Sequence, residues 1–262
     1  MDIVNKLWEL LRPYDHTGDY GSWEDARNNS TGYDDPLILE RTTQAILKIK
    51  RGESVYERDS ILFDTIEYSY PVLAGVMWVA ARYGGWLNVL DFGGSLGTTY
   101  FQNYAFIKNL PEYQWNIIEQ PEYVNVGKTL LQDEFLMFFP DIRSCLESAN
   151  NPNVCLCSSS LQYVEYPYTV LMELAGIPTV KCIIIDRIPF HDGKDDRLCV
   201  QRVPPEIYPA SYPIWIFSKE KFVHYLNTLG FNILTEWENL DRLKAPIPVS
   251  YRGMIFVREG WI

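Results

Sequence analysis

Three glycines, at positions 93, 94 and 97, follow an apolar segment that ends in an acidic residue. The segment 87–90 reads Leu-Asn-Val-Leu, and Asp91 comes directly after it. Glycine has no Cβ, so the backbone can turn sharply there and a ligand can lie close to the main chain. In a doubly wound α/β sheet, the turn between the first strand and its helix is where a nucleotide-like ligand lies. We therefore expect a cofactor to contact Asp91, Gly93, Gly94, Ser95 and Gly97.

The spacing of these glycines favours one class of cofactor. The dinucleotide fingerprint is G-x-G-x-x-G, and a phosphate-binding P-loop needs Lys and Ser or Thr after its last glycine. This loop reads D-x-G-G-x-x-G and has no such lysine. A loop that carries its own carboxylate repels a pyrophosphate but suits a cofactor with an amino-acid end and a ribose, which describes S-adenosylmethionine (SAM). The alternative is a tight structural turn without a ligand.

Polar residues at the ends of other predicted strands are further candidates, because ligands of open α/β sheets bind beyond the carboxyl ends of the strands. Glu119 ends the second predicted strand and can accept hydrogen bonds from both hydroxyls of a ribose. Ser158, Ser159 and Ser160 follow the fourth strand and would serve as small polar contacts for an amino-acid moiety. The alternatives are a solvated carboxylate and ordinary loop serines.

The fifth predicted strand ends in the strongest candidates for proton transfer. Asp186, Arg187, His191 and Asp192 combine acids, a base and an imidazole within seven positions. Histidine is the side chain best suited to take a proton near neutral pH. We expect His191 to act as a general base that Asp186 or Asp192 orients. The alternative for Asp186 and Arg187 is an ion pair that braces the loop.

Aromatic and proline-rich segments supply candidate contacts for an acceptor substrate. Residues 15–33 are rich in Gly, Ser, Asn and aromatics without hydrophobic periodicity, and such loops are often functional. Within the proline-rich stretch 187–213, prolines fix the path of residues 202–213, a segment that would wall a pocket or form a structural crossover or an oligomer contact. We expect Tyr20, Trp23 and Tyr33 to form a lid. The full set of predicted substrate contacts is Tyr20, Trp23, Tyr33, Tyr163, Arg187, Arg202, Tyr208 and Tyr212.

Regular alternation of strands and helices must position these residues. Helices are predicted over 1–12, 36–50, 61–67 and 71–82. Strands at 87–90, 114–119, 135–139, 154–158 and 180–186 then alternate with helices at 95–108, 121–132, 142–150 and 167–175. A last helix at 219–229 precedes strands at 231–237 and 253–257, which suit an antiparallel hairpin. This alternation predicts a mostly parallel sheet covered on both faces. We expect an N-terminal extension over 1–70 and an α/β domain over 71–262 that carries the proline-rich insertion 187–213.

Composition excludes several classes of partner. The 262 residues carry a formal net charge of −11, which argues against binding to nucleic acid or to an anionic membrane. No apolar run reaches the roughly 18 residues of a spanning helix. The five cysteines are odd in number and lie largely in strand-like runs, so we expect free thiols in a reducing compartment, without a bound metal. A cytoplasmic protein with a small-molecule substrate is expected; the oligomeric state stays open, a homodimer included.

These motifs resemble the successive motifs of class I SAM-dependent methyltransferases. The resemblance is carried by the loop 91–97, by Glu119 and by the string Ser-Ser-Ser-Leu-Gln-Tyr at 158–163. More narrowly, the chain resembles a family of methyltransferases associated with bacterial surface-polysaccharide genes. That likeness is carried by Gly-Asp-Tyr-Gly-Ser-Trp at 18–23, Ile-Glu-Gln-Pro at 118–121, Ile-Asp-Arg-Ile-Pro-Phe at 185–190 and Gln-Arg-Val-Pro-Pro at 201–205.

The resemblance implies a Rossmann-like, seven-stranded, mostly parallel sheet with an antiparallel last strand. It places SAM over Gly93 to Gly97, with its ribose on Glu119 beside Gln120 and its methionine end near Asp91. Ser159, Ser160 and Leu161 would complete the site, with Asp141 as the adenine contact. The implied activity is methyl transfer to a small polar acceptor, such as a sugar or a sugar nucleotide. The alternatives are an NAD(P)-dependent oxidoreductase, disfavoured by the missing G-x-G-x-x-G, and a non-catalytic binding protein with the same fold.

Overall fold

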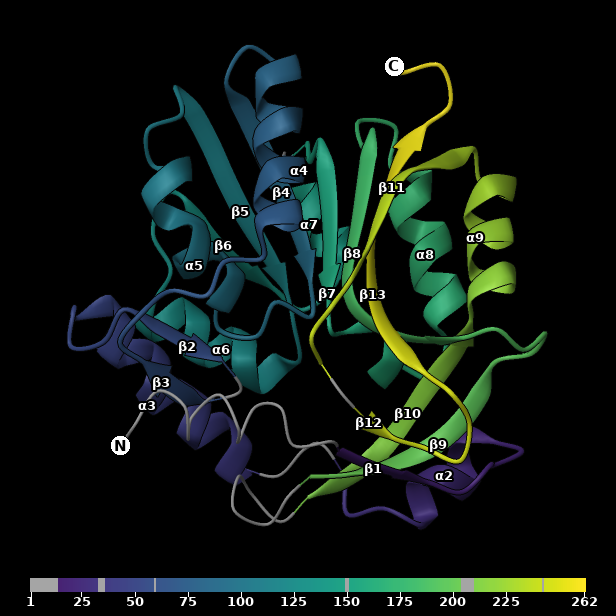
Figure 1. Cartoon of the computed structure of the whole chain (residues 1–262). Helices are drawn as coiled ribbons and strands as arrows, with labels where there is room; N and C mark the ends of the chain where they lie inside the picture. The colour runs from purple at the N-terminus through teal and green to yellow at the C-terminus, as the bar shows by residue number, and fades with distance from the viewer. Residues whose placement is uncertain (1–13, 33–35, 59, 149–150, 204–209, 242) are drawn as a thin grey trace.

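The computed structural model describes residues 14–32, 36–58, 60–148, 151–203, 210–241 and 243–262. The predicted helix over 1–12 and the predicted contacts Tyr33 and Tyr208 lie outside these ranges. The described chain is a mixed α/β protein in which a central, mostly parallel sheet of the Rossmann-like kind carries helices on both faces (Figure 1).

The N-terminal part supplies small elements that lie around the edge of this sheet. They are β1 (Tyr14–Thr17), α2 (Trp23–Asn28), α3 (Pro36–Lys50), β2 (Tyr56–Arg58), β3 (Ile61–Phe63) and α4 (Tyr70–Arg82). The predicted helices over 36–50 and 71–82 are confirmed. Residues 15–33, expected without regular structure, include a strand and a helix. The strand β1 forms because it pairs with a strand that is distant in the sequence. The helix α2 begins after Ser22, whose hydroxyl accepts from the Asp25 N–H.

The helix predicted over 61–67 is wrong. β2 and β3 pair antiparallel instead, and the turn between them includes Ser60 with φ of 67°. Tyr56 and Phe63 face each other across this hairpin with ring centroids 5.7 Å apart. The contact between these two buried side chains stabilises the hairpin. The helical spacing over 61–67 covers too few residues to distinguish a helix from a strand.

The alternating part of the sequence folds as predicted, with small shifts at the ends of elements. It comprises β4 (Trp86–Phe92), α5 (Thr98–Ile107), β5 (Glu112–Ile118), α6 (Pro121–Leu130), β6 (Leu136–Phe139), α7 (Ile142–Glu147), β7 (Val154–Ser158), the 3₁₀ turn η1 (Leu161–Tyr163), α8 (Pro167–Gly176) and β8 (Cys182–His191). β7 and β8 are buried almost throughout. Continuous apolar runs are typical of such parallel strands, which are covered on both faces.

The described residues of the proline-rich stretch, 187–203 and 210–213, are largely strand rather than loop. β8 continues through Pro189 to His191, and β9 (Arg197–Arg202) pairs antiparallel with β10 (Ser211–Ser218), which includes Pro213. Proline fits the extended backbone although it donates no hydrogen bond, so proline content alone overestimated the irregular structure. The remaining elements are α9 (Lys219–Thr228), β11 (Phe231–Glu238), β12 (Leu243–Lys244) and β13 (Ser250–Arg258).

In the part of the chain that the structure describes, hydrogen bonds join eleven strands into one sheet, so the predicted count of seven is wrong. The order is β12-β1-β9-β10-β8-β7-β4-β5-β6, with β13 on β8 and β11 on β13. The additional strands attach where β8 extends beyond β7, since Phe217 and Ser218 pair with Phe190 and His191. The sequence showed no sign of this extension. The predicted antiparallel last strand is confirmed, because β13 runs antiparallel to both β8 and β11.

Two apolar layers hold the helices on the sheet. One packs α4, α5 and α6 around Trp115 and Phe138, and the other packs α7, α8 and α9 around Phe190 and Phe222. All five cysteines are buried and unbridged, as predicted. Of the described helices, none is long and apolar enough to cross a membrane. The parallel strands β4 and β7 end at one edge of the sheet, beside the middle of β8, and β2, β3 and α3 face this edge (Figure 1).

Candidate functional site

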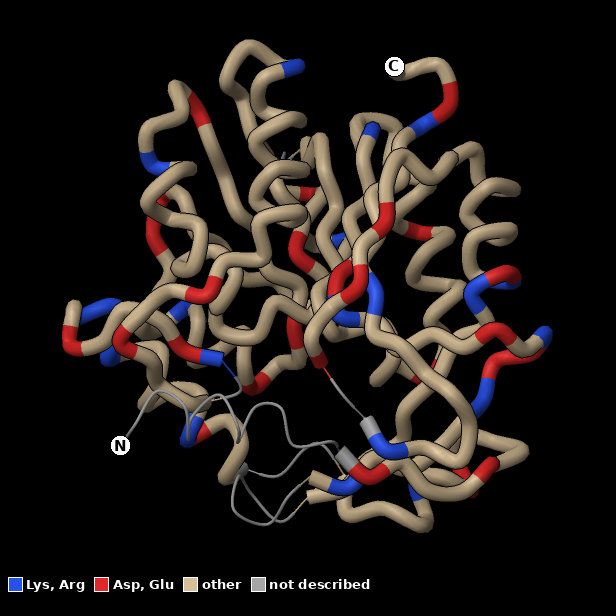
Figure 2. Tube along the Cα trace, viewed as in Figure 1, with Lys and Arg blue, Asp and Glu red and all other residues tan. Residues whose placement is uncertain are grey.

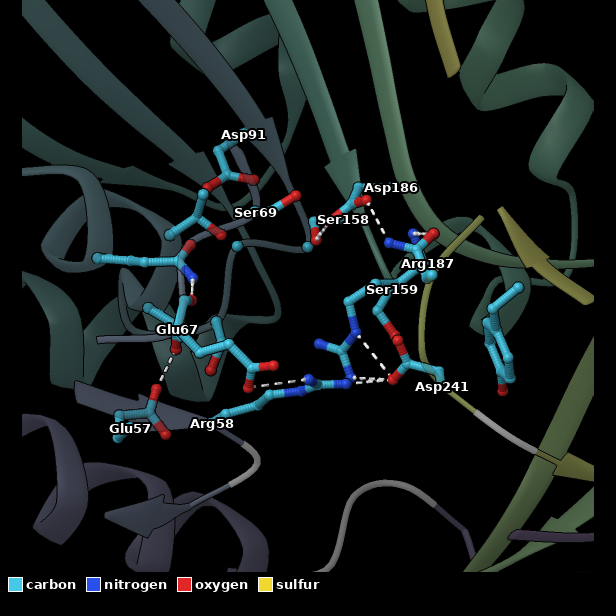
Figure 3. Close-up of a pocket in the computed structure, with 18 of the residues that line it drawn as sticks. Glu57, Arg58, Glu67, Ser69, Asp91, Ser158, Ser159, Asp186, Arg187 and Asp241 are labelled. Carbon is cyan, nitrogen blue, oxygen red and sulfur yellow. Dashed lines mark hydrogen bonds and ion pairs between the residues drawn. The ribbon is translucent and has the colours of Figure 1, made fainter. Parts of the chain in front are cut away.

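A cavity of about 380 Å³ lies at the carboxyl ends of β4 and β7 and beside Asp186 and Arg187 in the middle of β8 (Figure 3). Side chains from β2, from the connection before α4 and from the end of β11 close it from other sides. The cavity brings together a large part of the predicted site. The predicted residues that line it are Asp91, Gly93, Gly94, Ser95, Ser159, Tyr163, Asp186, Arg187 and Tyr212.

The glycine loop lies tightly against two neighbours. Gly93 has φ of +70°, a conformation that favours glycine, and a side chain there would collide with Ser160. A Cβ at Gly94 would lie 2.6 Å from the carboxylate of Asp91. The loop therefore passes directly over this carboxylate, and only residues without side chains allow the approach. Gly97 follows as the N-cap of α5.

Asp91 is an acid with spare hydrogen-bonding capacity in a buried position. Its side chain is fully buried, and its Oδ2 accepts a hydrogen bond from Nε1 of Trp115 at 2.9 Å. Its Oδ1 has no partner among the residues that the structure describes. Burial raises the pKa of Asp91 to about 7, although the Trp115 bond lowers it. An unpaired carboxylate oxygen at a cavity wall is suited to a cationic group of a ligand.

Glu119 fixes the conformation of the loop from the neighbouring strand. Its Oε1 accepts from the Ser95 N–H at 3.0 Å, and its Oε2 accepts from the Gln120 N–H at 2.9 Å. Burial raises the pKa of Glu119, and these two backbone donors lower it in part. A carboxylate offers about four acceptor positions, so lone pairs remain for the hydroxyls of a ribose. Gln120 itself precedes α6 as its N-cap.

Three predicted cofactor contacts have structural roles in this chain. Asp141 is exposed and caps α7, since its Oδ1 accepts from the Ser144 N–H at 2.7 Å. Leu161 is fully buried in the apolar layer beside α8. Ser160 is buried against Gly93, and its hydroxyl has no partner among the described residues. The structure does not bring Asp141 or Leu161 to the cavity, and the other predicted cofactor residues that do not line it are Gly97, Glu119, Gln120 and Ser160.

A β-bulge in the middle of β8, beside the end of β7, turns two consecutive side chains toward the cavity. Ile185 pairs with Met254 and Ile188 with Arg252, so Asp186 and Arg187 both lie opposite one residue of β13. Arg187 has φ of +55°, which is rare for a residue with a side chain. Successive side chains of a regular strand point to opposite faces. The bulge removes that alternation, and both residues line the cavity.

Asp186 is held by two donors and leaves one oxygen facing the cavity. Its Oδ1 accepts from Nε1 of Trp237 at 3.0 Å and from Nδ2 of Asn239 at 2.9 Å. Its Oδ2 makes only a long contact of 3.5 Å with the Ser158 hydroxyl. Burial raises the pKa of Asp186 despite the two donors and the neighbouring Arg187. Gly253 allows this arrangement, because a side chain there would overlap the Trp237 indole.

The structure does not bring His191 and Asp192 to this cavity. His191 lies five positions beyond Asp186 on β8, about 16 Å at the usual rise of a strand. Its Nδ1 accepts from the Gly193 N–H at 3.0 Å, and its Nε2 lies 2.9 Å from the carbonyl oxygen of Asp195. A carbonyl only accepts, so Nε2 carries the hydrogen and the ring braces the turn between β8 and β9. Asp192 lines the same separate hollow as His191.

Two predicted tyrosines belong to a polar network on one wall of the cavity. Tyr163 donates its hydroxyl to Oε1 of Gln201 at 3.1 Å, and Nε2 of Gln201 donates to the Tyr212 hydroxyl at 3.2 Å. The two rings meet edge to face, with centroids 5.3 Å apart. Nε2 of the buried His16 lies 3.2 Å from the same Gln201 oxygen. The network holds both tyrosines in fixed positions.

The other predicted substrate contacts that the structure describes lie elsewhere. Trp23 stacks on Trp215 with centroids 6.1 Å apart, and Tyr20 packs beside it against β9. This packing places both aromatics on the far side of β9 and β10 instead of over the cavity. Arg202 is exposed at the end of β9. The predicted lid residues Tyr20 and Trp23 are therefore not brought to the cavity.

Sequence reasoning missed an ion-pair cluster inside the cavity (Figure 3). One oxygen of Asp241 accepts from Arg58 and from Arg187, whose Nε and Nη2 lie at 3.2 and 3.1 Å. Burial raises the pKa of Asp241, but the two guanidiniums outweigh it and hold that pKa below its ordinary value. Arg58 and Asp241 are 183 positions apart, so no local pattern links them. β11 also ends at this edge, and the strand-end rule applied there would have identified Asn239 and Asp241.

The cavity is more acidic than the chain as a whole. Acidic and basic residues are interspersed along the described chain (Figure 2). The cavity lining, by contrast, has only Arg58 and Arg187 as basic residues against Glu57, Glu67, Asp91, Asp186, Glu238 and Asp241. Such a balance favours a ligand that carries positive charge. Within the described ranges, no group of three or more His, Cys, Asp or Glu side chains is arranged to hold a metal ion.

Comparison with known proteins gives matches at the level of the fold. No protein-family model and no curated protein matches the chain. The N-terminal domain of EvdMO1, crystallised in the presence of SAH and D-fucose, is 13% identical, with a TM-score of 0.51 over 86% of this chain and 97% of that one. A SAM-dependent methyltransferase from Clostridium acetobutylicum is 10% identical, with a TM-score of 0.51 over 84% of this chain and 99% of that one.

Proposed function

We propose that this protein transfers a methyl group from SAM to a hydroxyl of a small polar acceptor. One observation carries the proposal: the glycine loop, the Asp91 carboxylate with an oxygen unpaired among the described residues, the polar end of β7 and the bulge of β8 meet in one acidic cavity. The two structures compared above support it, since one is a SAM-dependent methyltransferase and the other was crystallised with SAH, S-adenosylhomocysteine.

The residues around the loop fit SAM as a cofactor. Gly94 has no side chain over Asp91, so the loop backbone lies close to the carboxylate, whose buried Oδ1 has no partner among the described residues. We propose that Asp91 pairs with the cationic amino-acid end, together with Ser159 at the end of β7. Glu119 would accept from the ribose hydroxyls with the lone pairs that Ser95 and Gln120 leave available. The acidic lining favours the positive charge of the sulfonium.

Asp186 is the residue best placed to remove a proton from the acceptor. When bound, SAM supplies a methyl carbon that forms a bond to the acceptor oxygen as its bond to sulfur breaks, leaving SAH. Asp186 Oδ2 faces the cavity, while Trp237 and Asn239 fix the other oxygen. A pKa raised toward neutrality makes a carboxylate a better base at physiological pH. We therefore assign the base to Asp186 in place of His191, whose ring nitrogens both contact the main chain.

We further propose a sugar or a sugar nucleotide as the acceptor, in surface-polysaccharide biosynthesis. The four strings that resemble that methyltransferase family support this class, as does the D-fucose present with EvdMO1. Residues 1–70 would close the acceptor side as an extension of the α/β domain over 71–262, since Thr42 and Arg58 line the cavity. Five unbridged cysteines support a reducing compartment such as the cytoplasm.

Cofactor binding is the first test. Thermal unfolding is measured with SAM, SAH, NAD⁺ and NADP⁺, because a ligand at 100 times its dissociation constant stabilises the fold by about 2.7 kcal/mol. We expect SAM and SAH to raise the unfolding temperature and the nicotinamide nucleotides to leave it unchanged. Stabilisation by NAD⁺ or NADP⁺ alone would favour an oxidoreductase and contradict the proposal.

Turnover is the second test. Transfer of labelled methyl groups from SAM to a panel of sugars and sugar nucleotides is compared for the wild type, Asp186→Asn and His191→Gln. Loss of a general base costs about 10²-fold to 10⁴-fold in rate, so Asp186→Asn should lose at least about 10²-fold in kcat while it keeps its affinity for SAH. His191→Gln should retain turnover. Full turnover by Asp186→Asn would remove Asp186 from the mechanism.

A further inference from the structure

Two arginines from distant elements converge on one carboxylate oxygen inside the cavity. Arg58 lies on β2 and Arg187 on the bulge of β8, and both donate to Oδ1 of Asp241. Their side chains are only 15% and 22% exposed. Arginine presents a planar fork of donors that matches a carboxylate or a phosphate. Two such forks directed at one point form a binding geometry for an oxyanion.

The backbone of Arg187 is constrained to hold this position. Its φ of +55° is unfavourable for a residue with a side chain, and such conformations persist only where the surroundings impose them. Here the Arg187 N–H donates to Asn239 at 3.3 Å, and its carbonyl accepts from Gln162 at 3.3 Å. An ion pair between surface loops would not require this unfavourable backbone conformation. The conformation directs the guanidinium into the cavity.

The cluster lies on the acceptor side of the cavity. Figure 3 shows Arg58, Arg187 and Asp241 together, away from Asp91 and beyond Asp186. Tyr163 and Tyr212 line the same cavity. A group bound by the two arginines would therefore belong to the acceptor and not to the amino-acid end of the cofactor.

Asp241 can leave this position without disrupting the core. It lies between β11 and β12, in a connection that is neither helix nor strand at 239–241. Its neighbour Leu240 is 71% exposed, so the chain here runs along the surface. If Asp241 moves outward, an incoming oxyanion leaves neither guanidinium unpaired. The exchange avoids the large cost of a buried charge without a partner.

We propose that Arg58 and Arg187 bind an oxyanion of the acceptor, a carboxylate or a phosphate, and that Asp241 occupies this subsite until the acceptor arrives. The inference rests on the proposed function, since it assigns a chemical class to the acceptor of the same site. Asp241 thereby competes with the acceptor at the high effective concentration of a group on the same chain. Removing its charge should tighten anion binding, whereas removing an arginine should weaken it.

Anion binding to the SAH-loaded protein tests the proposal. Thermal unfolding is followed at rising inorganic phosphate or acetate, with chloride keeping the ionic strength constant, for the wild type, Asp241→Asn and Arg187→Gln. Arg252→Gln is the matched control, because Arg252 is 28% exposed and paired with Glu236 but does not line the cavity. We expect Asp241→Asn to bind the preferred anion at least about tenfold more tightly and Arg187→Gln at least about tenfold more weakly. Preference for phosphate or for acetate identifies the group that the acceptor carries.

Equal anion affinity in Asp241→Asn and the wild type would overturn the subsite, as would unchanged affinity in Arg187→Gln. If Asp241→Asn does not fold, Arg58→Gln provides the test, since it leaves Asp241 paired with Arg187, and unchanged anion affinity there would also overturn it. SAH binding is measured first for each variant. Failure of the wild type to bind SAH contradicts the proposed function. Normal SAH binding together with unchanged anion affinity in the variants contradicts the subsite alone.

Discussion

The Asp91 carboxyl should make the stability of the protein depend on pH in a defined direction. Burial raises its pKa to about 7 from an ordinary value of 3.8. The folded state therefore binds this proton more tightly than the unfolded state does. Its contribution to stability is constant below about pH 4, falls as the pH rises to about 7 and is constant again above that. At about 1.4 kcal/mol for each pH unit, the ionised form costs the folded state about 4 kcal/mol.

The substitution Asp91→Asn isolates this effect. The amide stays neutral at every pH and can still accept from Trp115, so any cost of its new N–H donors is independent of pH. Between pH 5.5 and 8.5, the free energy of unfolding of the wild type should fall by about 2 kcal/mol relative to that of Asp91→Asn. Free energies of unfolding from urea titrations, followed by tryptophan fluorescence at several pH values in this range, measure the difference.

An exposed aspartate provides the control. Asp141 caps α7, and the Ser144 N–H lowers its pKa below the ordinary value. Asp141 is ionised throughout this pH range, so the difference in free energy of unfolding between the wild type and Asp141→Asn should stay constant. The reasoning about Asp91 is refuted if the difference in free energy of unfolding between the wild type and Asp91→Asn is independent of pH or changes in the opposite direction.

Three further predictions follow from close contacts around the cavity. Gly94→Ala should weaken SAH affinity at least about tenfold in calorimetry, because its Cβ would lie 2.6 Å from the buried carboxylate beneath the loop; Gly176→Ala, where the Cβ meets open space, should bind SAH normally. Gly253→Ala should displace the Trp237 indole from Asp186 and lower the free energy of unfolding by about 1–3 kcal/mol, measured in urea. Trp237→Phe removes a donor that lowers the pKa of Asp186, so the acid limb of the pH–kcat profile should move to higher pH; an unmoved limb would exclude Asp186 as the titrating base.

Local patterns in the sequence were sufficient to predict the elements that hold the glycine loop. The apolar run before Asp91 and the glycines after it predicted β4, the turn and α5, since a strand, a sharp bend and a helix each leave a signature within a few residues. The same holds for β5 with Glu119 and for β7 with its serines. These predictions depended on the neighbours along the chain alone.

The side of the cavity that Asp186 and Arg187 line was not predictable from local patterns in the sequence. Asp186 was identified at a strand end, but Arg187 joins it in the cavity only because β8 forms a bulge opposite Gly253. His191 was the preferred base, and the continuation of β8 carries it away from the cavity. One extra residue in a strand pair decides which side chains face the cavity, and no local pattern records it.

The sequence by itself determined the alternating strands and helices from β4 to β8, the glycine loop and the two carboxylates beside it, because those features depend on residues close together in the chain. Only the tertiary structure decided that Arg58 and Asp241 meet across 183 positions, and that four more strands extend the sheet beyond the predicted seven. Contacts between distant segments depend on strand register and on the packing of whole elements. The cluster of Arg58, Arg187 and Asp241 consists of such contacts.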